Sequence, residues 1–188
     1  CDVGRDVLKI AIVDRHHASK LVGIGYVRGF GLKRGAIAAT TNCTNQNLVI
    51  VGVTDQDLAD AAHACRRLGG GYVVVNDGQL VASVPLPVAG IMSDRPWEVV
   101  CEQSEAANEA ARALGCKIHA PFLIMSFVGL AGVPDLGLTE RGLIDTRAQS
   151  FVDVVLTKRA QRVCCRCPSH GHPVHAEMDI ETFSPAES

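Results

Sequence analysis

The sequence predicts an α/β (α+β) fold: a mixed, largely antiparallel sheet with two main helices packed on it. Three observations support this. Short runs rich in Val and Ile, bounded by Gly, Asn or basic residues, fill the first third of the chain. Two longer segments place their apolar residues at helical spacing. One pair of β-prone runs flanks an Asn-Asp-Gly sequence, which is the signal of an antiparallel hairpin.

Length and composition narrow the class of protein. The 188 residues suffice for one domain with a buried core, or for one domain plus a tail. A net charge of -2 argues against a nucleic-acid partner or an acidic membrane surface. The apolar stretches are shorter than the roughly 18 residues of a spanning helix. The N-terminus lacks a signal-peptide pattern. Because the chain begins with Cys rather than Met, we expect a piece of a longer protein.

The cysteines indicate a reducing compartment. Of the 8 in the chain, several stand singly in predicted strands or helices, where Cys behaves as a small apolar residue. A chain with 47% hydrophobic residues has no need of disulfide bonds to stabilise its core. We therefore expect free thiols and a cytoplasmic location.

Four strands are predicted in the first third, over residues 8–13, 21–29, 35–41 and 47–53. The second of them carries several glycines. A Gly inside a strand weakens it unless another backbone or a ligand comes close. We favour close sheet packing with a bulge over contact with a ligand.

A first helix is predicted within residues 54–71. Thr54 is a suitable N-cap, the acidic residues Asp55 and Asp57 suit the first turn, and Gly69 suits a left-handed C-cap. The glycines that follow precede a strand, whereas a phosphate-binding loop runs from a strand to a helix. We therefore reject a phosphate site here.

A hairpin and a second helix follow. The hairpin covers residues 71–86 with its turn at Asn76-Asp77-Gly78. The helix runs from Pro96, in its first turn, to Gly115, and we expect Ser93 or Asp94 to be its N-cap.

The rest of the domain is less regular. Residues 121–130 are predicted as a buried strand or a short helix, because periodicity does not separate the two. Loop residues then precede a last strand at 151–156. We place the domain at residues 1–156 and interpret residues 157–188 as a disordered or weakly attached tail, since this segment has no period of either kind.

The tail contains thiols and imidazoles, which zinc prefers as ligands. Their spacing lacks the second arm of a structural zinc site, so specific zinc binding, weak adventitious binding and an inert tail all stay open. We assign no metal site to the chain, and the low-ranked candidates are Cys164, Cys165, Cys167, His170, His172 and His175. The adjacent histidines His16 and His17 follow a predicted strand, and we interpret them as part of a turn.

Three stretches in this order resemble the C-terminal domain of bacterial adenine deaminase, in the amidohydrolase superfamily. They are RHHASKLVGIGYVRGFGLKRGAIAATT, GGGYVVVNDGQLVASVPLPVAGIMSD and GLTERGLID. The resemblance covers roughly residues 7–156. It implies a part of an enzyme that converts adenine and water into hypoxanthine and ammonia.

The resemblance also implies a division of labour. In the family, a divalent metal ion (manganese or iron) activates the attacking hydroxide, and its ligands lie in a preceding (β/α) barrel. A barrel of about 250 residues does not fit in this chain. We therefore expect no catalytic residue and no cofactor in this chain, a barrel partner in cis or in trans, and an inactive isolated chain.

The same resemblance suggests substrate-loop candidates. In the family the loop after GAIA is polar and approaches the mouth of the active site. Here Asn47 matches the family pattern, whereas Cys43 and Gln46 stand where histidines are typical and Thr44 stands where an aspartate is, so we expect an altered loop. Lys33 and Arg34 match as well, either as a basic turn near the purine entrance or as a solvated turn. Ser93 and Asp94 also match, but helix capping explains them without a ligand.

Two hypotheses on function follow. The first is the C-terminal portion of an adenine deaminase that needs its barrel. The alternative is a non-catalytic remnant or interaction module from a truncated or split gene. An apolar sheet face left without its barrel predicts self-association of the isolated chain into a homo-oligomer.

Overall fold

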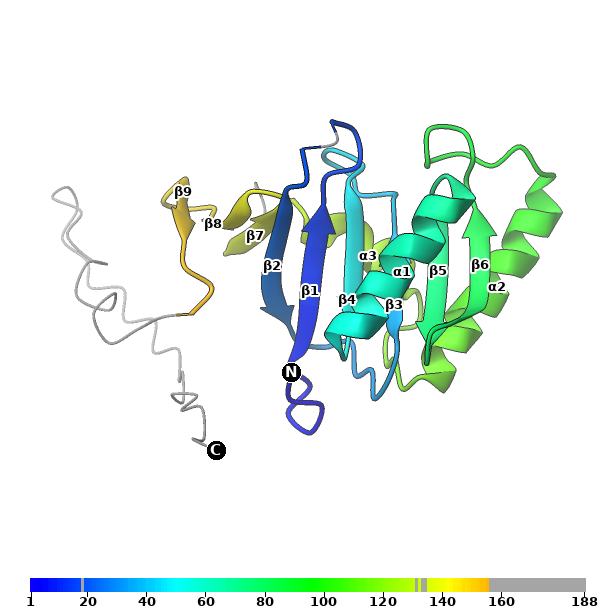
Figure 1. Cartoon of the computed structure of the whole chain (residues 1–188), viewed down its shortest axis with the longest axis horizontal. Coiled ribbons are helices and arrows are strands. Elements are labelled where there is room, and N and C mark those ends of the chain that lie inside the picture. The colour runs from blue at the N-terminus through cyan, green and yellow to red at the C-terminus, as the bar shows by residue number, and fades with distance from the viewer. Residues whose placement is uncertain (18, 131, 133–134, 156–188) are drawn as a thin grey trace, which may run out of the picture. The chain divides into compact units, whose positions relative to one another are not determined.

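The computed structural model describes residues 1–17, 19–130, 132 and 135–155, and residues Cys1–Val154 form one compact unit (Figure 1). The fold is α+β with antiparallel sheets, as the sequence predicted. Among the described residues, no helix combines the length and apolarity needed to cross a membrane. The predicted tail and its Cys/His cluster lie outside the described residues.

A six-stranded antiparallel sheet forms the centre of this unit. Its strands lie in the order β2-β1-β4-β3-β5-β6. Their bounds are β1 Leu8–Val13, β2 Val22–Val27, β3 Ala36–Ala39, β4 Leu48–Gly52, β5 Gly71–Asn76 and β6 Gln79–Pro85. The β5–β6 hairpin turns at Asp77 and Gly78, both at positive φ, as the sequence predicted.

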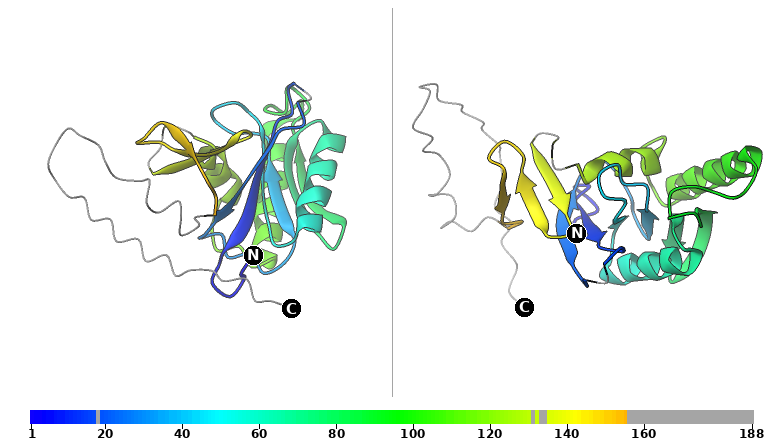
Figure 2. Two further views of the ribbon diagram at one scale, coloured as in Figure 1. Left: turned by 60° about the vertical axis from the view of Figure 1, so that its left-hand side comes forward. Right: turned by 90° about the horizontal axis from the view of Figure 1, so that it is seen from above.

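Helices cover both faces of this sheet, as the view from above shows (Figure 2). One face packs against α1 (Asp55–Leu68), which lies over the central strands. The other packs against α2 (Trp97–Ala113) and α3 (Pro121–Val128), which together bury the larger core. Residues 121–130, which the sequence predicted as either a buried strand or a short helix, contain helix α3.

The caps of α1 follow the prediction. The Thr54 side chain accepts a hydrogen bond from the Asp57 backbone N–H at 3.1 Å. Gly69 ends the helix with a φ of 76°. Both signals are local, so neighbouring residues alone are enough to specify them.

The predicted cap of α2 is wrong. The helix begins at Trp97 with Pro96 at the N-cap, and no side chain caps it. Ser93 Oγ instead accepts a hydrogen bond from the Arg95 N–H at 3.1 Å, within the preceding loop. A proline disfavours helical conformation in the residue before it, so the helix cannot extend back to Ser93 or Asp94.

A second, three-stranded sheet was not predicted in full. It consists of β7 (Leu136–Thr139), β8 (Gly142–Asp145) and β9 (Ser150–Val152), paired antiparallel. The sequence predicted only a strand at 151–156, which in the structure begins at Ser150 and ends at Val152, and a loop before it. Strands of four residues are too short for a clear period of two, and the Gly and Asp residues in these strands are typical of turns.

This sheet explains the glycines of β2. A Cβ on Gly23 would lie 1.8 Å from the Thr139 carbonyl oxygen, so only glycine lets the β7 backbone come this close. Gly25 is less constrained, since its added Cβ would meet the Leu138 side chain at 3.5 Å. Close sheet packing is thus the reason, as predicted. The expected bulge is absent from the described β1–β2 pairing.

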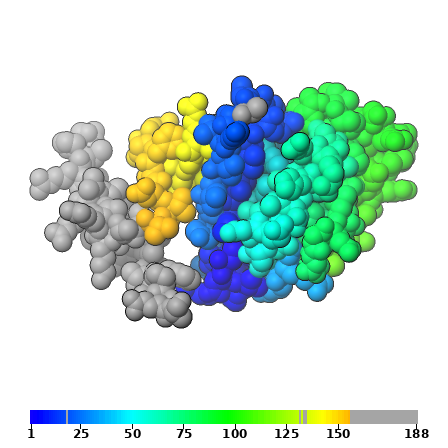
Figure 3. Space-filling view, viewed as in Figure 1, coloured from blue at the N-terminus to red at the C-terminus, as the bar shows by residue number. Residues whose placement is uncertain are grey.

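One part of the six-stranded sheet is covered by none of the described helices. Val22, Ile24 and Tyr26 of β2 are 47%, 49% and 51% exposed. They lie on the α1 side, because Ile24 pairs with Ala11, which packs in the α1 core. In Figure 3 this surface is the blue area beside α1.

Candidate functional site

The loops at one end of the six-stranded sheet form the candidate site. Because β1, β3 and β6 run in the same direction, the loops that follow them leave the sheet at the same end, the upper end in Figure 1. We call this the loop end; it comprises residues 14–17, 19–21, 40–47, 69–70 and 86–96. All three stretches that carry the family resemblance reach it.

Thr40 joins three of these segments. Its side chain is 1% exposed, and its Oγ1 accepts a hydrogen bond from the Gly71 N–H at 2.8 Å. The same hydroxyl donates to the Gly90 carbonyl oxygen at 2.5 Å. One buried hydroxyl therefore connects the end of β3, the start of β5 and the loop after β6.

Arg15 connects the same end through its guanidinium group. Its Nε donates to the Gln46 carbonyl oxygen at 2.5 Å, and its Nη2 donates to the Ala89 carbonyl oxygen at 2.6 Å. Burial lowers the pKa of Arg15. Within the described part of the chain Arg15 pairs with no carboxylate. The cation thus holds two loops by their carbonyl groups alone.

Glu140 reaches the loop end from the turn between β7 and β8. Its Oε2 accepts hydrogen bonds from Asn45 Nδ2 at 3.2 Å and from Asn47 Nδ2 at 3.1 Å. Asn45 Oδ1 in turn accepts from the Asn47 N–H at 3.0 Å. Asn47, the one residue of this loop that matches the family pattern, is buried and holds the second sheet to the loop.

The tip of the β3–β4 loop contacts the end of α3. The Cys43 N–H donates to the Ser126 carbonyl oxygen at 3.0 Å, while its thiol is exposed. Thr44 Oγ1 donates to the Gly129 carbonyl oxygen at 3.2 Å. Asn42 is buried and its Oδ1 accepts from the Thr44 N–H, but its Nδ2 has no partner among the described residues.

The structure separates the predicted substrate-loop residues into two groups. Cys43, Gln46 and Asn47 lie at the loop end. Lys33 and Arg34 lie in the β2–β3 turn, at the opposite end of the sheet, where Lys33 Nζ donates to the Val3 carbonyl oxygen at 3.0 Å. The two groups therefore cannot line one pocket of this domain.

Gln46 contributes through its backbone. Its φ of 50° is unusual for a residue with a side chain, and its carbonyl oxygen is the one that Arg15 holds. The two histidines His16 and His17 contact different segments. His16 Nε2 lies 2.9 Å from the Asn45 carbonyl oxygen, whereas His17 Nδ1 lies 3.4 Å from Asp14 Oδ1.

Asp14 is the strongly perturbed acid of this end. Its carboxylate accepts hydrogen bonds from the Ser19 hydroxyl and from the His16 N–H, which hold the pKa of Asp14 well below its usual range. The negative charge therefore stabilises the β1–β2 turn rather than acting as a proton donor near neutral pH.

Sequence reasoning missed Thr40, Arg15 and Glu140 as parts of this end. Each lies inside a stretch that carries the family resemblance, which is the one signal that could have indicated them. The described residues offer no group of three or more His, Cys, Asp or Glu side chains able to hold a metal ion.

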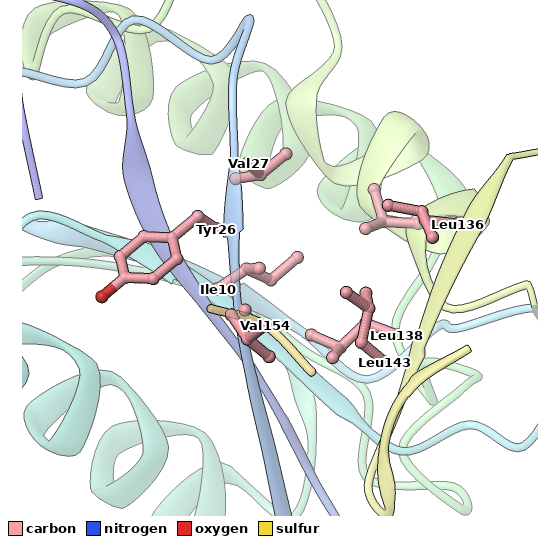
Figure 4. A pocket seen from close by; sticks show the side chains of 9 residues that line it. Ile10, Tyr26, Val27, Leu136, Leu138, Leu143 and Val154 are labelled. Atoms are coloured by element: carbon pink, nitrogen blue, oxygen red, sulfur yellow. The ribbon is translucent and has the colours of Figure 1, made fainter. Parts of the chain in front are cut away.

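A cleft of about 290 Å³ lies between β2 and the second sheet (Figure 4). Its lining is mostly apolar and includes Ile10, Val27, Val128, Leu136, Leu138 and Leu143. Tyr26 points away from the leucine side chains in this view. A purine carries several hydrogen-bonding nitrogens, and the one polar side-chain group of this lining, the Tyr26 hydroxyl, points away from the leucines, so the cleft suits adenine poorly.

Comparison with known proteins agrees with the resemblance seen in the sequence. The family model for the adenine deaminase C-terminal domain matches residues 1–150. The adenine deaminase of Clostridium botulinum is 44% identical over 154 residues, which are 82% of this chain and 26% of the relative. That of Moorella thermoacetica is 45% identical over 153 residues, with 81% and 26% covered.

The adenine deaminase of Brucella melitensis is 43% identical over 151 residues, which are 80% of this chain and 26% of the relative. The chain thus spans about a quarter of the length of each of these proteins. An identity of 43–45% over more than 150 residues is well above that of unrelated chains. The chain belongs to the adenine deaminase C-terminal domain family.

Proposed function

We propose that this chain serves as the C-terminal portion of an adenine deaminase, the enzyme that converts adenine and water into hypoxanthine and ammonia, and that it is inactive alone. The observation that carries the proposal is the coverage. The chain covers 26% of the length of relatives named adenine deaminase. The family model that it matches is that of the adenine deaminase C-terminal domain. The remaining three quarters of the relatives are the source of the catalytic barrel in this proposal.

The metal belongs to that barrel. The described residues do not fit a divalent metal ion, because they bring no three metal-binding side chains together. We therefore derive no metal-dependent step from this chain and assign the manganese or iron ion to the partner domain, in cis or in trans. The five cysteines of the described region are free, which supports the proposed cytoplasmic location.

The role of this domain is then to present a shaped surface to the barrel. Thr40, Arg15 and Glu140 fix the loops of the loop end relative to one another. Preorganised loops lower the entropic cost of docking. In this proposal the β3–β4 loop acts by its shape, since Cys43 and Gln46 replace the histidines typical of the family.

A chimera tests the proposal. The C-terminal quarter of the Moorella thermoacetica relative is replaced by this chain, and ammonia release from adenine is measured with Mn²⁺ present. We expect the chimera to recover at least a tenth of the activity of the intact relative, and the isolated chain to release no ammonia. A folded chimera no more active than the relative without its C-terminal quarter would favour the alternative, a non-catalytic remnant or interaction module.

The same chimera tests the altered loop. The triple variant Cys43→His, Thr44→Asp, Gln46→His restores the residue types of the family pattern. If the loop acts by shape, the rate changes less than about twofold. A rise of tenfold or more would show that its side chains take part in substrate handling.

A further inference from the structure

The turn at residues 88–92, within the loop end, has an unusual conformation; we call it the apolar turn. Val88 and Met92 exchange two backbone hydrogen bonds of 3.1 Å across it. Ala89 and Gly90 between them have φ values of 55° and 71°. Glycine adopts such values freely, but an alanine there costs about 1 kcal/mol. The turn therefore exists because the surrounding structure imposes it.

A buried hydroxyl and a half-buried guanidinium group from other segments hold the apolar turn. The Gly90 carbonyl oxygen accepts from Thr40 Oγ1, and the Ala89 carbonyl oxygen accepts from Arg15 Nη2. The backbone also packs without room to move: a Cβ on Gly70 would lie 2.5 Å from the Gly90 Cα. The turn is thus fixed from three sides.

The side chains that the apolar turn presents are hydrophobic. Val88, Ile91 and Met92 are 44%, 42% and 58% exposed. Exposed turns usually carry Gly, Pro, Asn, Asp or Ser. A cluster of apolar side chains on a rigid turn is a feature of binding surfaces, and methionine is enriched in them because its flexible side chain fits irregular cavities.

We propose that the apolar turn is the contact through which this domain docks on the catalytic portion of adenine deaminase, with Met92 entering an apolar depression there. The inference rests on the proposed function. The catalytic portion is the proposed occupant because three quarters of each relative lies outside the matched region, and domains linked in one chain form contact surfaces with one another.

The outer face of α3 is the rival surface. Leu123, Ile124 and Phe127 on it are 58%, 43% and 51% exposed. They lie on a regular helix and need no imposed conformation. The apolar turn, by contrast, contains a strained alanine and is held by Thr40 and by a half-buried arginine that pairs with no carboxylate among the described residues. Such an arrangement makes sense where the exact position of the tip matters.

Hydroxyl-radical footprinting tests the proposal without a mutation. The purified 188-residue chain and the Moorella chimera are oxidised side by side, and oxidation of each peptide is quantified by mass spectrometry. We expect Met92 to react at least fivefold more slowly in the chimera, while Leu123 and Phe127 react equally in both. Met125, which is fully buried, is the internal control for folding.

Two results would overturn the inference: equal reactivity of Met92 in both proteins, or protection confined to Leu123 and Phe127. The deaminase activity of the same chimera sample separates this failure from a failure of the proposed function. An active chimera with unprotected Met92 rejects the apolar turn alone. An inactive chimera with unprotected Met92 rejects both.

A matched pair of variants in the chimera gives an independent readout. Met92→Asp places a charge in the proposed contact, and Leu123→Asp places one at a residue with the same 58% exposure on the rival surface. We expect Met92→Asp to speed proteolytic cleavage at the domain junction at least fivefold and Leu123→Asp to change it less than twofold. Met92→Leu, which keeps the apolar contact, should behave as the wild type. The reverse order of the two Asp variants would place the contact on α3.

Discussion

The two ends of the six-stranded sheet are closed in different ways. At the loop end, side chains from distant segments connect the loops to one another: Thr40, Arg15 and Glu140 all bind groups on other loops. At the opposite end, the β2–β3 turn is tied to the α2–α3 connection by backbone bonds, from Lys33 N to Leu114 O and from Lys117 N to Phe30 O, both at 2.8 Å. The side chains of Asp6 and Lys33 add hydrogen bonds there, but at exposed or half-buried positions.

This difference indicates at which end the relative positions of the loops depend on particular side chains. Backbone bonds between loops depend little on side-chain identity. The buried Thr40 hydroxyl and the half-buried Arg15 and Glu140 side chains need hydrogen-bond partners, so a fold that uses them fixes the geometry of that end. The following predictions, from the largest expected effect to the smallest, test this contrast.

Thr40→Val should show the largest effect. Valine keeps the shape of threonine but leaves the Gly71 N–H and the Gly90 carbonyl oxygen without their partner in a buried site. We expect the free energy of unfolding, measured by urea titration, to fall by about 3 kcal/mol. Lys33→Met at the opposite end is the control, with a change of less than about 0.5 kcal/mol. Similar losses for the two variants would remove the contrast between the ends.

Gly23→Ala should come next, with Gly25→Ala as its matched control in the same strand. The added Cβ at position 23 would collide with the Thr139 carbonyl oxygen and push Glu140 away from Asn45. We expect a loss of about 2 kcal/mol in unfolding free energy for Gly23→Ala and less than about 0.5 kcal/mol for Gly25→Ala. Equal tolerance at both positions would mean that the second sheet does not rest on Gly23.

Ala89 and Asp6, one at each end, have positive φ values of 55° and 56° and should respond to glycine in opposite directions. The Ala89 side chain makes no polar contact, so Ala89→Gly relieves strain and should raise the unfolding free energy by about 0.5 kcal/mol. The Asp6 carboxylate accepts from the Gly29 N–H at 3.0 Å and the Gly31 N–H at 2.7 Å. Asp6→Gly should therefore lower the unfolding free energy by about 1 kcal/mol. Chemical denaturation of both variants checks the opposite signs.

The smallest effect concerns pH. The pKa of Asp14 is lowered in the folded chain, chiefly by the Ser19 hydroxyl. Its contribution to stability is therefore fully present above the unfolded pKa of about 4 and is lost as pH falls further toward the folded pKa. Asp14→Asn should melt at a lower temperature than the wild type at pH 7, and the gap should close as the pH is lowered below about 4. A gap that stays constant down to pH 2 would argue against the ionised carboxylate as its cause.

Local signals were sufficient for much of the fold. The caps of α1 and the turn of the β5–β6 hairpin follow from residues next to one another in the chain. Of the site, the sequence indicated the polar β3–β4 loop and the residues that match the family pattern. It misplaced the start of α2, because a proline outweighs a good capping residue three positions earlier. It also missed β7 and β8, because strands of four residues leave almost no periodic signal.

By itself the sequence determined the α+β class, the family and the positions of the main strands and helices, since apolar period, capping residues and turn residues act over a few neighbours. Only the tertiary structure decided which end of the sheet forms the candidate site. The partners that build it are far apart in the chain: Thr40 and Gly90 are 50 residues apart, and Asn45 and Glu140 are 95. Whether a buried polar group finds its partner depends on how the strands bring distant loops together, and no local pattern records that.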